Sequence, residues 1–367
     1  MEQQQLDEET GTNFRLDLLS SLLGQQIASG ILNYNTIDDD DEDRVPNSCP
    51  HPVFIGNSCT KCGQETNGTI STIPFWYIYP RLNVCLKEVN RIRDTNLQRL
   101  LSRRKLHLVV DLDHTLVHTR KLYKLSPEDR NFLRLRSKRY GVDYNLAGEL
   151  GTLFQVGDGW TKLRPFVREF LREASTMFDI TIYTLGCRAY AWDMSKLLDP
   201  DGMYFDNWRV ISREDCVALD KHKKCLDVVL EHERVVVVMD DNEAVWEDHK
   251  TNLFKVTPYN YFSYFSPEDK VHDASPPRLS WSQLNGDESG ENGVLAMALD
   301  KLRLVHQAFF DDNSTVKGIE DYGNRDVRQV LQRVLMKQKS LSKKQKKQQL
   351  KKINYNGLAR NLQAAHL

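Results

Sequence analysis

The chain has 367 residues, which is enough for one to three domains with a full hydrophobic core. Its 50 basic and 51 acidic side chains give a net charge of −1, so the overall charge favours no particular partner. No stretch approaches the roughly 18–20 apolar residues that a membrane span needs. The polar start, residues 1–5, also lacks the pattern of a signal peptide. We therefore expect a protein that neither spans a membrane nor is secreted.

Two charged segments differ from the rest of the chain. Residues 1–45 are polar and contain the acidic run 38–43, which predicts a disordered acidic arm. Residues 339–367 are rich in Lys and Gln and predict a basic tail. The lysines within 343–347 have the density of a nuclear localisation signal. Weak binding of nucleic acid and a solvated helix end are the alternatives for this tail.

The seven cysteines are odd in number, which argues against a disulfide framework and for a reducing compartment, the cytosol or the nucleus. Segment 46–66 contains four residues of the types that bind zinc tetrahedrally: Cys49, His51, Cys59 and Cys62. We therefore predict a small Cys/His-rich element with a structural Zn²⁺. The Cys-x-His spacing is tighter than in most zinc knuckles, and a Pro/Gly-rich loop with incidental thiols is the alternative.

Apolar residues recur every three to four positions from residue 82 to 106, which predicts a helix within a helical linker at 67–104. Strands and helices then alternate through a domain at 105–275. The predicted strands are 106–111, 179–184, 208–211 and 235–241, and the predicted helices are 122–140, 165–177, 188–198 and 222–231. This alternation predicts an α/β fold with a parallel sheet and helices on both faces. Two amphipathic helices, 294–310 and 325–338, make a predicted helical extension at 294–338.

Asp111 and Asp113 follow the buried strand 108–110, at the carboxyl end of the predicted sheet, where open α/β folds place their chemistry. One carboxylate of such a pair can hold a hard cation and attack as a nucleophile. The other can move a proton to or from a leaving group. The alternative is a strand that simply ends in two solvated acids.

Other polar residues end the later strands or precede them. Thr184 ends the strand 179–184, and Asp240 and Asp241 end the strand 235–241, so all are expected at the same sheet edge. Lys224, on the predicted helix 222–231, can reach a phosphate as a point charge. Each residue also has a simpler explanation: a helix cap for Thr184, a helix N-terminus for the aspartates and a solvated lysine cluster for Lys224.

The Asp-x-Asp-x-Thr arrangement at 111–115 resembles that of the haloacid-dehalogenase phosphatases. Together with the motifs at 162–166, 183–186 and 238–241, it resembles the RNA polymerase II C-terminal-domain phosphatases, especially the plant C-terminal-domain-phosphatase-like proteins. The resemblance covers residues 46 to 335. It implies a haloacid-dehalogenase-like sheet and a phosphatase catalytic domain at 105–275.

The resemblance also implies a role for individual residues. Asp111 matches the nucleophile and Mg²⁺ ligand, and Asp113 matches the general acid/base that also binds the metal through its carbonyl. Arg164 and Thr184 match phosphate contacts, Asp241 a direct Mg²⁺ ligand and Asp240 a supporting acid. Lys224 matches the active-site lysine, with Lys223 or Lys221 as alternatives if the helix register slips.

Two departures from the family pattern affect these expectations. The chain turns basic after 326–328, where relatives often continue into a phosphopeptide-binding BRCT domain, so we expect a form without that domain. Thr184-Leu185-Gly186 also stands where small or aromatic residues are usual, which could alter the peptide groove.

We therefore expect a nuclear Mg²⁺-dependent serine/threonine phosphatase that works through an aspartyl-phosphate. Its expected partners are the phosphorylated heptad repeats of RNA polymerase II and transcription factors. A phosphatase of another phosphoprotein or of small molecules, and a non-catalytic binding module, are the alternatives.

Overall fold

The computed structural model describes residues 49–65, 70–140, 152–205, 209–216, 222–263, 281–284, 286–310, 325–337 and 340. The predicted acidic arm at 1–45 and all but residue 340 of the predicted basic tail at 339–367 lie outside these residues. Within the described ranges, no helix has the length and apolar character to cross a bilayer.

A five-stranded parallel sheet forms the centre of the molecule, in the order β10-β9-β5-β11-β12. Its strands are β5 (Leu106–Val110), β9 (Phe178–Tyr183), β10 (Val210–Ile211), β11 (Val236–Asp240) and β12 (Leu253–Lys255). All residues of β5 and β11 are buried, as expected for central strands that are covered on both faces. Each buried Val or Leu side chain contributes about 1.5–3 kcal/mol. The predicted α/β fold is therefore confirmed.

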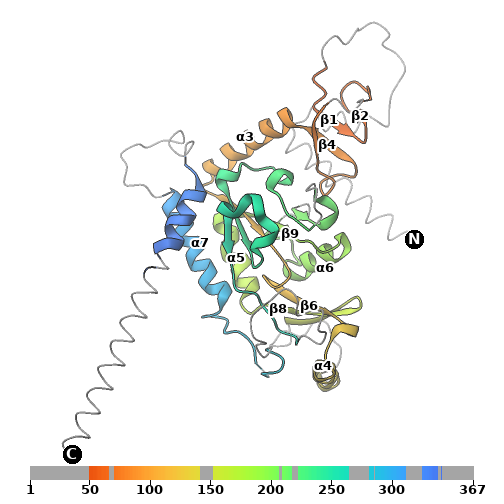
Figure 1. The fold of residues 1–367 in the computed structure, drawn as a ribbon, viewed down its shortest axis with the longest axis vertical. Helices are drawn as coiled ribbons and strands as arrows, with labels where there is room; N and C mark the ends of the chain where they lie inside the picture. Colours follow the sequence, from red (N-terminus) through yellow and green to blue (C-terminus); the bar gives the residue numbers. More distant parts are fainter. Residues whose placement is uncertain are drawn as a thin grey trace, which may run out of the picture.

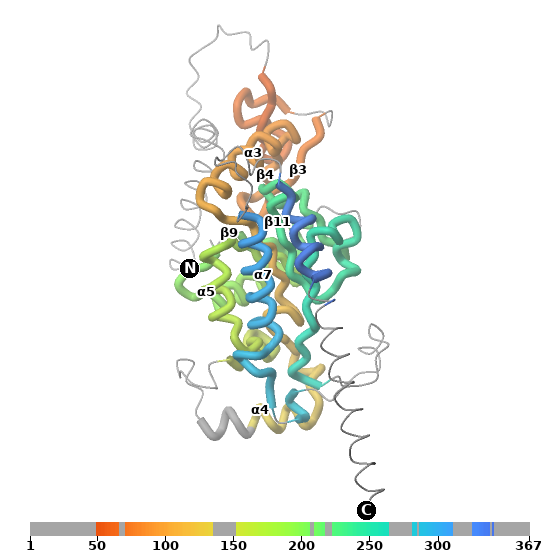
Figure 2. The backbone as a smooth tube through the Cα atoms, turned by 90° about the vertical axis from the view of Figure 1, so that its left-hand side faces the viewer, coloured from red at the N-terminus to blue at the C-terminus, as the bar shows by residue number. Residues whose placement is uncertain are grey.

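Alternate residues of the central strands enter two different hydrophobic clusters, because successive side chains point to opposite faces of a sheet. Val110 and Val237 pack with α5 (Val167–Met177), α6 (Arg188–Leu198), α7 (Val294–Phe310) and the helical residues 327–337. Figure 2 shows α5 and α7 side by side along this face. Val109 and Val238 pack on the other face with residues 75–84, the first half of α3 (Leu86–Ser102) and residues 226–230.

The predicted helical linker at 67–104 is helical only in its second part, α3, and two strands occupy its first part. β1 (Val53–Ile55), β2 (Ser58–Cys59), β3 (Thr72–Pro74) and β4 (Leu82–Cys85) form an antiparallel sheet in the order β2-β1-β4-β3, here called the N-terminal sheet. The helix predicted from residue 82 begins only at Leu86, because residues 82–85 pair with β1 and β3. Figure 1 shows this sheet at one end of the molecule, continuing into α3.

A second antiparallel sheet, which the sequence analysis missed, lies between β5 and α5. β6 (Val117–Lys121), β7 (Leu153–Val156) and β8 (Gly159–Leu163) pair in the order β6-β8-β7. The Gly157-Asp158 turn joins β7 to β8, and Gly157 adopts the positive φ of 54° that a tight hairpin turn requires. This turn is the feature of the local sequence that indicates a hairpin here. The 3-10 helix η2 (Leu122–Lys124) and α4 (Pro127–Tyr140) replace the single helix predicted at 122–140. Figure 1 places α4 at the opposite end of the molecule from the N-terminal sheet.

The helix predicted at 222–231 is wrong. Apart from the short 3-10 helix η5 (Leu226–Val228), the described residues of this segment are irregular. The backbone N–H of Lys224 donates to Val245 O, and the carbonyls of Leu226, Asp227 and Val229 accept hydrogen bonds from Arg93. Tertiary partners therefore satisfy the backbone that a helix would have satisfied internally.

Asp179 is the centre of a charge cluster near the start of β9, at the opposite end of this strand from Thr184. Its carboxylate lies 2.8 Å from Arg99, 3.4 Å from Lys105 and 3.5 Å from Arg209. Although burial raises the pKa of Asp179, these cations outweigh it and lower the pKa to about 2. The ionised carboxylate therefore stabilises the folded state above pH 4, and this contribution is lost as the pH falls from about 4 towards 2.

We predict that Asp179→Asn lowers the free energy of unfolding by about 1–2 kcal/mol at pH 7, a value discounted for the partial exposure of the cluster. The difference from the wild type should narrow as the pH falls below 4, because the wild-type carboxylate then becomes protonated. Urea unfolding between pH 3 and pH 7 measures both effects. A difference that does not change with pH would show that packing, and not charge, is responsible.

Candidate active site

The register of the central sheet brings three strand ends to one edge. Val110 of β5 pairs with Ile182 of β9 on one side and with Met239 of β11 on the other. Because these strands are parallel, Asp111, Thr184 and Asp240 meet at the carboxyl edge of the sheet. The structure thus brings together residues that are as much as 129 positions apart (240 − 111).

Lys224 connects two of these strand ends. Its Nζ donates to Asp111 Oδ1 at 2.5 Å and to Asp240 Oδ2 at 2.7 Å, and its side chain is only 2% exposed. The ammonium also lies 5.6 Å from the ring centroids of both Tyr183 and Trp246. Trp246 Nε1 donates to the same Asp240 oxygen at 2.8 Å. The aromatic rings and the carboxylates together compensate for the loss of water around the ammonium.

The position of Lys224 separates it from the alternative lysines. Lys223 points elsewhere, with its Nζ 3.0 Å from Ala244 O and 2.8 Å from Glu247. Lys221 lies outside the described residues. Of the described lysines in this segment, Lys224 is therefore the one that contacts the predicted nucleophile.

The acidic groups of the site carry more negative charge than Lys224 can balance. Burial raises the pKa of Asp111 well above its usual range, and the charge of Asp240 adds to this effect. Burial and the Asp240 charge likewise raise the pKa of Asp241 to about 6. Burial lowers the pKa of Lys224, but Asp111 and Asp240 outweigh it and raise this pKa overall. The site therefore favours the binding of additional positive charge.

Three carboxylates meet the requirements of a divalent cation. Asp111, Asp240 and Asp241 each place one oxygen within 4.8 Å of the other two. Thr115 fixes the last of these, because its Oγ1 accepts the N–H of Asp241 at 3.1 Å and donates to Asp241 Oδ1 at 3.3 Å. Oxygen donors of this kind suit Mg²⁺, so the donor set fits the metal that the sequence predicts.

Asp113 is held by a residue that the sequence analysis did not identify. Tyr190 of α6 donates to Asp113 Oδ1 at 2.7 Å, and its oxygen is 2.8 Å from Thr119 Oγ1. Gly186 leaves the space for this ring, because a Cβ at Gly186 would lie 2.5 Å from Tyr190 Cδ1. Close packing between the 184–186 turn and α6 thus requires a residue without a Cβ at position 186. No local motif marks Tyr190, since buried tyrosines in helices are common.

Thr184 lies at the same edge and is buried. Its Oγ1 accepts the backbone N–H of Gly186 at 2.9 Å, and its own N–H donates to Ile211 O. The hydroxyl proton can therefore be donated to an incoming oxygen, as the predicted phosphate contact requires. That contact remains a prediction.

The guanidinium of Arg164 is bound by other groups of the protein in this structure. Its Nε and Nη2 donate to the carboxylate of Glu288 at 2.9 and 2.8 Å, and Nη2 also donates to Thr257 O. Its Nη1 donates to the carbonyls of His114 and Thr115. All five N–H groups are thus used within the protein, and the side chain is fully buried. Arg164 therefore holds the loop after Asp113, and its predicted phosphate contact stays a prediction.

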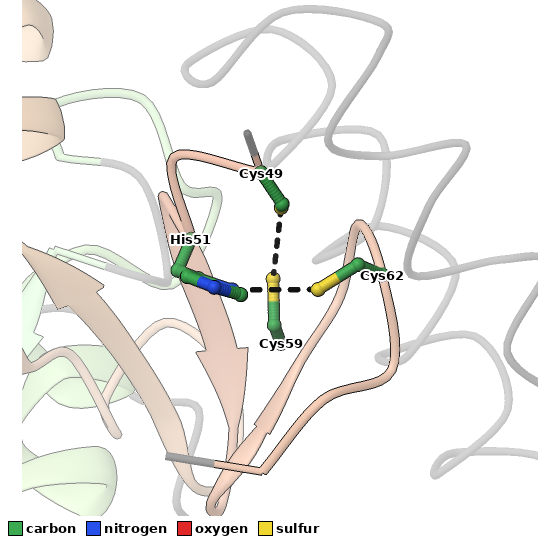
Figure 3. Close-up of side chains that lie close together, drawn as sticks. All are labelled: Cys49, His51, Cys59 and Cys62. Carbon is green, nitrogen blue, oxygen red and sulfur yellow. Dashed lines mark hydrogen bonds between the residues drawn. The ribbon is translucent and has the colours of Figure 1, made fainter. Parts of the chain in front are cut away.

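Three cysteines and one histidine in and around β1 and β2 form a second cluster of possible metal ligands, distinct from the three carboxylates. Figure 3 shows the side chains of Cys49, His51, Cys59 and Cys62 converging. One donor atom from each lies within 4.8 Å of the others, so this cluster could hold a metal ion.

Comparisons with known proteins agree with this description. Residues 106–279 match the family described as NLI interacting factor-like phosphatase. The chain is 41% identical over 286 residues to "RNA polymerase II C-terminal domain phosphatase-like 4" of Arabidopsis thaliana, covering 78% of this chain and 61% of that protein. It is 35% identical over 240 residues to "RNA polymerase II C-terminal domain phosphatase-like 3" of the same plant, covering 64% of this chain and 18% of that protein.

A solved structure, "The Structure of Fcp1, an essential RNA polymerase II CTD phosphatase", is 24% identical, with a TM-score of 0.48. The match covers 66% of this chain and 73% of that chain. Of the two plant relatives, the chain spans about three fifths of phosphatase-like 4 and less than a fifth of phosphatase-like 3.

We predict that Lys224→Met lowers the free energy of unfolding by about 3 kcal/mol in EDTA at pH 7, because it leaves buried carboxylates without their cation. Lys223→Met is the matched control and should cost about 0.5 kcal/mol or less, because its ion pair is exposed. Denaturant unfolding followed by Trp fluorescence measures both variants. Equal losses would show that Lys224 carries no special charge-balancing role.

Proposed function

We propose that the chain is a Mg²⁺-dependent protein serine/threonine phosphatase that forms an aspartyl-phosphate, because residues 106–279 match the NLI interacting factor-like phosphatase family. One observation supports this proposal above all. Asp111 is buried, held by Lys224 at 2.5 Å, and placed at the same sheet edge as a second aspartate that Tyr190 orients. A nucleophile, a proton-transfer group and a cation therefore meet at one edge of the sheet.

In the first step, a carboxylate oxygen of Asp111 attacks the phosphorus of a phosphoserine or phosphothreonine. The new oxygen–phosphorus bond forms as the bond from phosphorus to the Ser or Thr oxygen breaks. Asp113, protonated at this stage, gives its proton to the departing oxygen. Burial raises the pKa of Asp113, which favours its protonated form.

In the second step, water attacks the phosphorus of the aspartyl-phosphate and loses a proton to Asp113. The bond between phosphorus and the Asp111 oxygen breaks, which releases inorganic phosphate and restores both carboxyl groups to their starting states. Tyr190 keeps Asp113 in one orientation through both transfers.

Charge neutralisation comes from the residues around Asp111. Lys224 and the hydroxyl of Thr184 stabilise the negative charge on the phosphoryl oxygens. Asp111, Asp241 and the backbone carbonyl of Asp113 would hold Mg²⁺, with Asp240 as a supporting acid, and the metal would supply further positive charge when bound. The cysteine–histidine cluster takes no part in these steps.

We propose the phosphorylated heptad repeats of RNA polymerase II as the substrate, because the relatives at 41% and 35% identity are named for that polymerase domain. A nuclear location follows from this substrate, and transcription factors are further candidate partners. Any nucleic-acid contact is assigned to the basic tail, of which the structure describes only residue 340.

We predict that Asp111→Asn reduces turnover of a singly phosphorylated heptad peptide in Mg²⁺ by about 10³-fold or more, because the amide cannot act as the nucleophile. Asp113→Asn should be similarly inactive, since it cannot donate the proton. Phosphate release measures both variants, with circular dichroism as the test of folding. Near-normal turnover by either variant would rule out the aspartyl-phosphate mechanism. If the wild type acts only on small phosphomonoesters, the heptad repeats are not its substrate.

We predict that Tyr190→Phe lowers kcat by about ten-fold with little change in KM, because Asp113 loses its orienting hydrogen bond. Gly186→Ala should do the same by displacing the Tyr190 ring. Tyr123→Phe is the matched control, since Tyr123 is 66% exposed, and it should leave kcat unchanged. Steady-state kinetics on the same peptide tests the set. An unchanged kcat in Tyr190→Phe would remove this residue from the mechanism.

A further inference from the structure

The cysteine–histidine cluster has the dimensions of a tetrahedral metal site. The Sγ atoms of Cys49 and Cys59 are 3.9 Å apart, and Cys62 Sγ lies 3.3 Å from His51 Nδ1. Tetrahedral Zn²⁺ with Zn–S near 2.3 Å and Zn–N near 2.0 Å requires separations of about 3.8 Å and about 3.5 Å. The cysteines are free thiols in the structure, since a disulfide between Cys49 and Cys59 would bring their sulfur atoms to about 2.05 Å.

The backbone around the cluster also has the conformation that such a site needs. His51 adopts a positive φ of 45°, which is strained for a residue with a Cβ and directs its ring toward Cys62. The N–H of Lys61 donates to Cys59 Sγ at 3.4 Å, and the N–H of Gly63 donates to Cys59 O at 2.9 Å. Contacts of this kind orient thiolate ligands in metal sites.

The chemistry of the donors selects the metal. Three thiolates and one imidazole form a closed set of soft and borderline ligands, which favours Zn²⁺ over the oxygen-seeking Mg²⁺. The segment 49–65 has a small core, with Val53 and Phe54 among its few buried apolar side chains. A bound metal provides the stabilisation that so small a unit otherwise lacks.

The N-terminal sheet is linked to the segment that carries Lys224. Pro52 O accepts the N–H of Cys85, and β4 continues directly into α3. Tyr77, in the turn between β3 and β4, donates from its buried hydroxyl to Val228 O at 2.8 Å. On α3, Arg93 donates to the carbonyls of residues 226, 227 and 229, and Asn96 donates to Leu230 O.

We propose that Cys49, His51, Cys59 and Cys62 bind one Zn²⁺, and that the sheet it stabilises holds residues 224–230 in place behind Lys224. The zinc site stands on its own geometry, whereas its effect on turnover rests on the proposed phosphatase function. Because residues 225–230 contain no α-helix, contacts with Tyr77 and α3 contribute to the position of this segment, and so to that of Lys224, whose own N–H is held by Val245 O.

The metal is tested on the untagged full chain, purified without chelator. Elemental analysis should find about one Zn²⁺ per chain in the wild type and less than one tenth in the double variant Cys59→Ser/Cys62→Ser. Cys187→Ser is the matched control, because Cys187 lies outside the cluster, and it should keep its zinc. Replacement by Co²⁺ should give the visible spectrum of a tetrahedral thiolate site. Less than one tenth of an equivalent of Zn²⁺ per wild-type chain would overturn the proposal.

The structural effect is measured by hydrogen exchange, which does not depend on activity. In the double variant, amides of residues 224–230 should exchange at least ten-fold faster than in the wild type, while those of β5 stay protected. If the double variant does not fold, chelator-treated and zinc-reloaded wild-type protein provide the same comparison. Zinc binding with unchanged exchange at 224–230 would overturn the supporting role.

Turnover then separates the two proposals. If the wild type is an active phosphatase, loss of zinc should lower kcat/KM by about ten-fold through the displaced Lys224. An inactive wild type with zinc-dependent protection of 224–230 would contradict the phosphatase proposal and leave the zinc proposal supported.

Discussion

The contact of Lys224 with Asp111 and Asp240 is the interaction on which the rest of the site depends. A buried ammonium between two carboxylates is stable only while all three groups stay together, because separation leaves a charge without water or a partner. The contact joins the end of β5, the end of β11 and an irregular segment. Small shifts in any of these three parts would therefore weaken the charge balance at Asp111.

Most of the surrounding structure acts by positioning these groups. Trp246 holds Asp240, Thr115 links its loop to Asp241, and Tyr190 orients Asp113. Arg164 holds the carbonyls after Asp113 while Glu288 neutralises its charge. Neighbouring side chains thus fix the orientation of Asp113, Asp240 and Asp241 through hydrogen bonds.

Partners distant in the chain decide the conformation of residues 222–231 and the contacts of Arg164. The lysines at 221–224 and the apolar residues after them fit a helix locally, but the hydrogen bonds of this segment go to Arg93, Asn96 and Tyr77. Arg164 fits a phosphate contact by motif, but Glu288, which lies 124 positions away, takes its guanidinium. Local patterns contain no information about partners so distant in the chain.

What the sequence determined by itself is the set of chemical groups and the strands that carry them. The buried apolar runs before Asp111 and Asp240 predict parallel strands, and parallel strands bring their carboxyl ends to one edge. The spacing of Cys49, His51, Cys59 and Cys62 likewise indicated a ligand set before any contact was known. Only the tertiary structure decided which lysine meets the carboxylates, what Arg164 binds and which tyrosine orients Asp113. These contacts depend on the packing of segments far apart in the chain, because a buried charge must pair with whichever opposite charge the packing brings next to it.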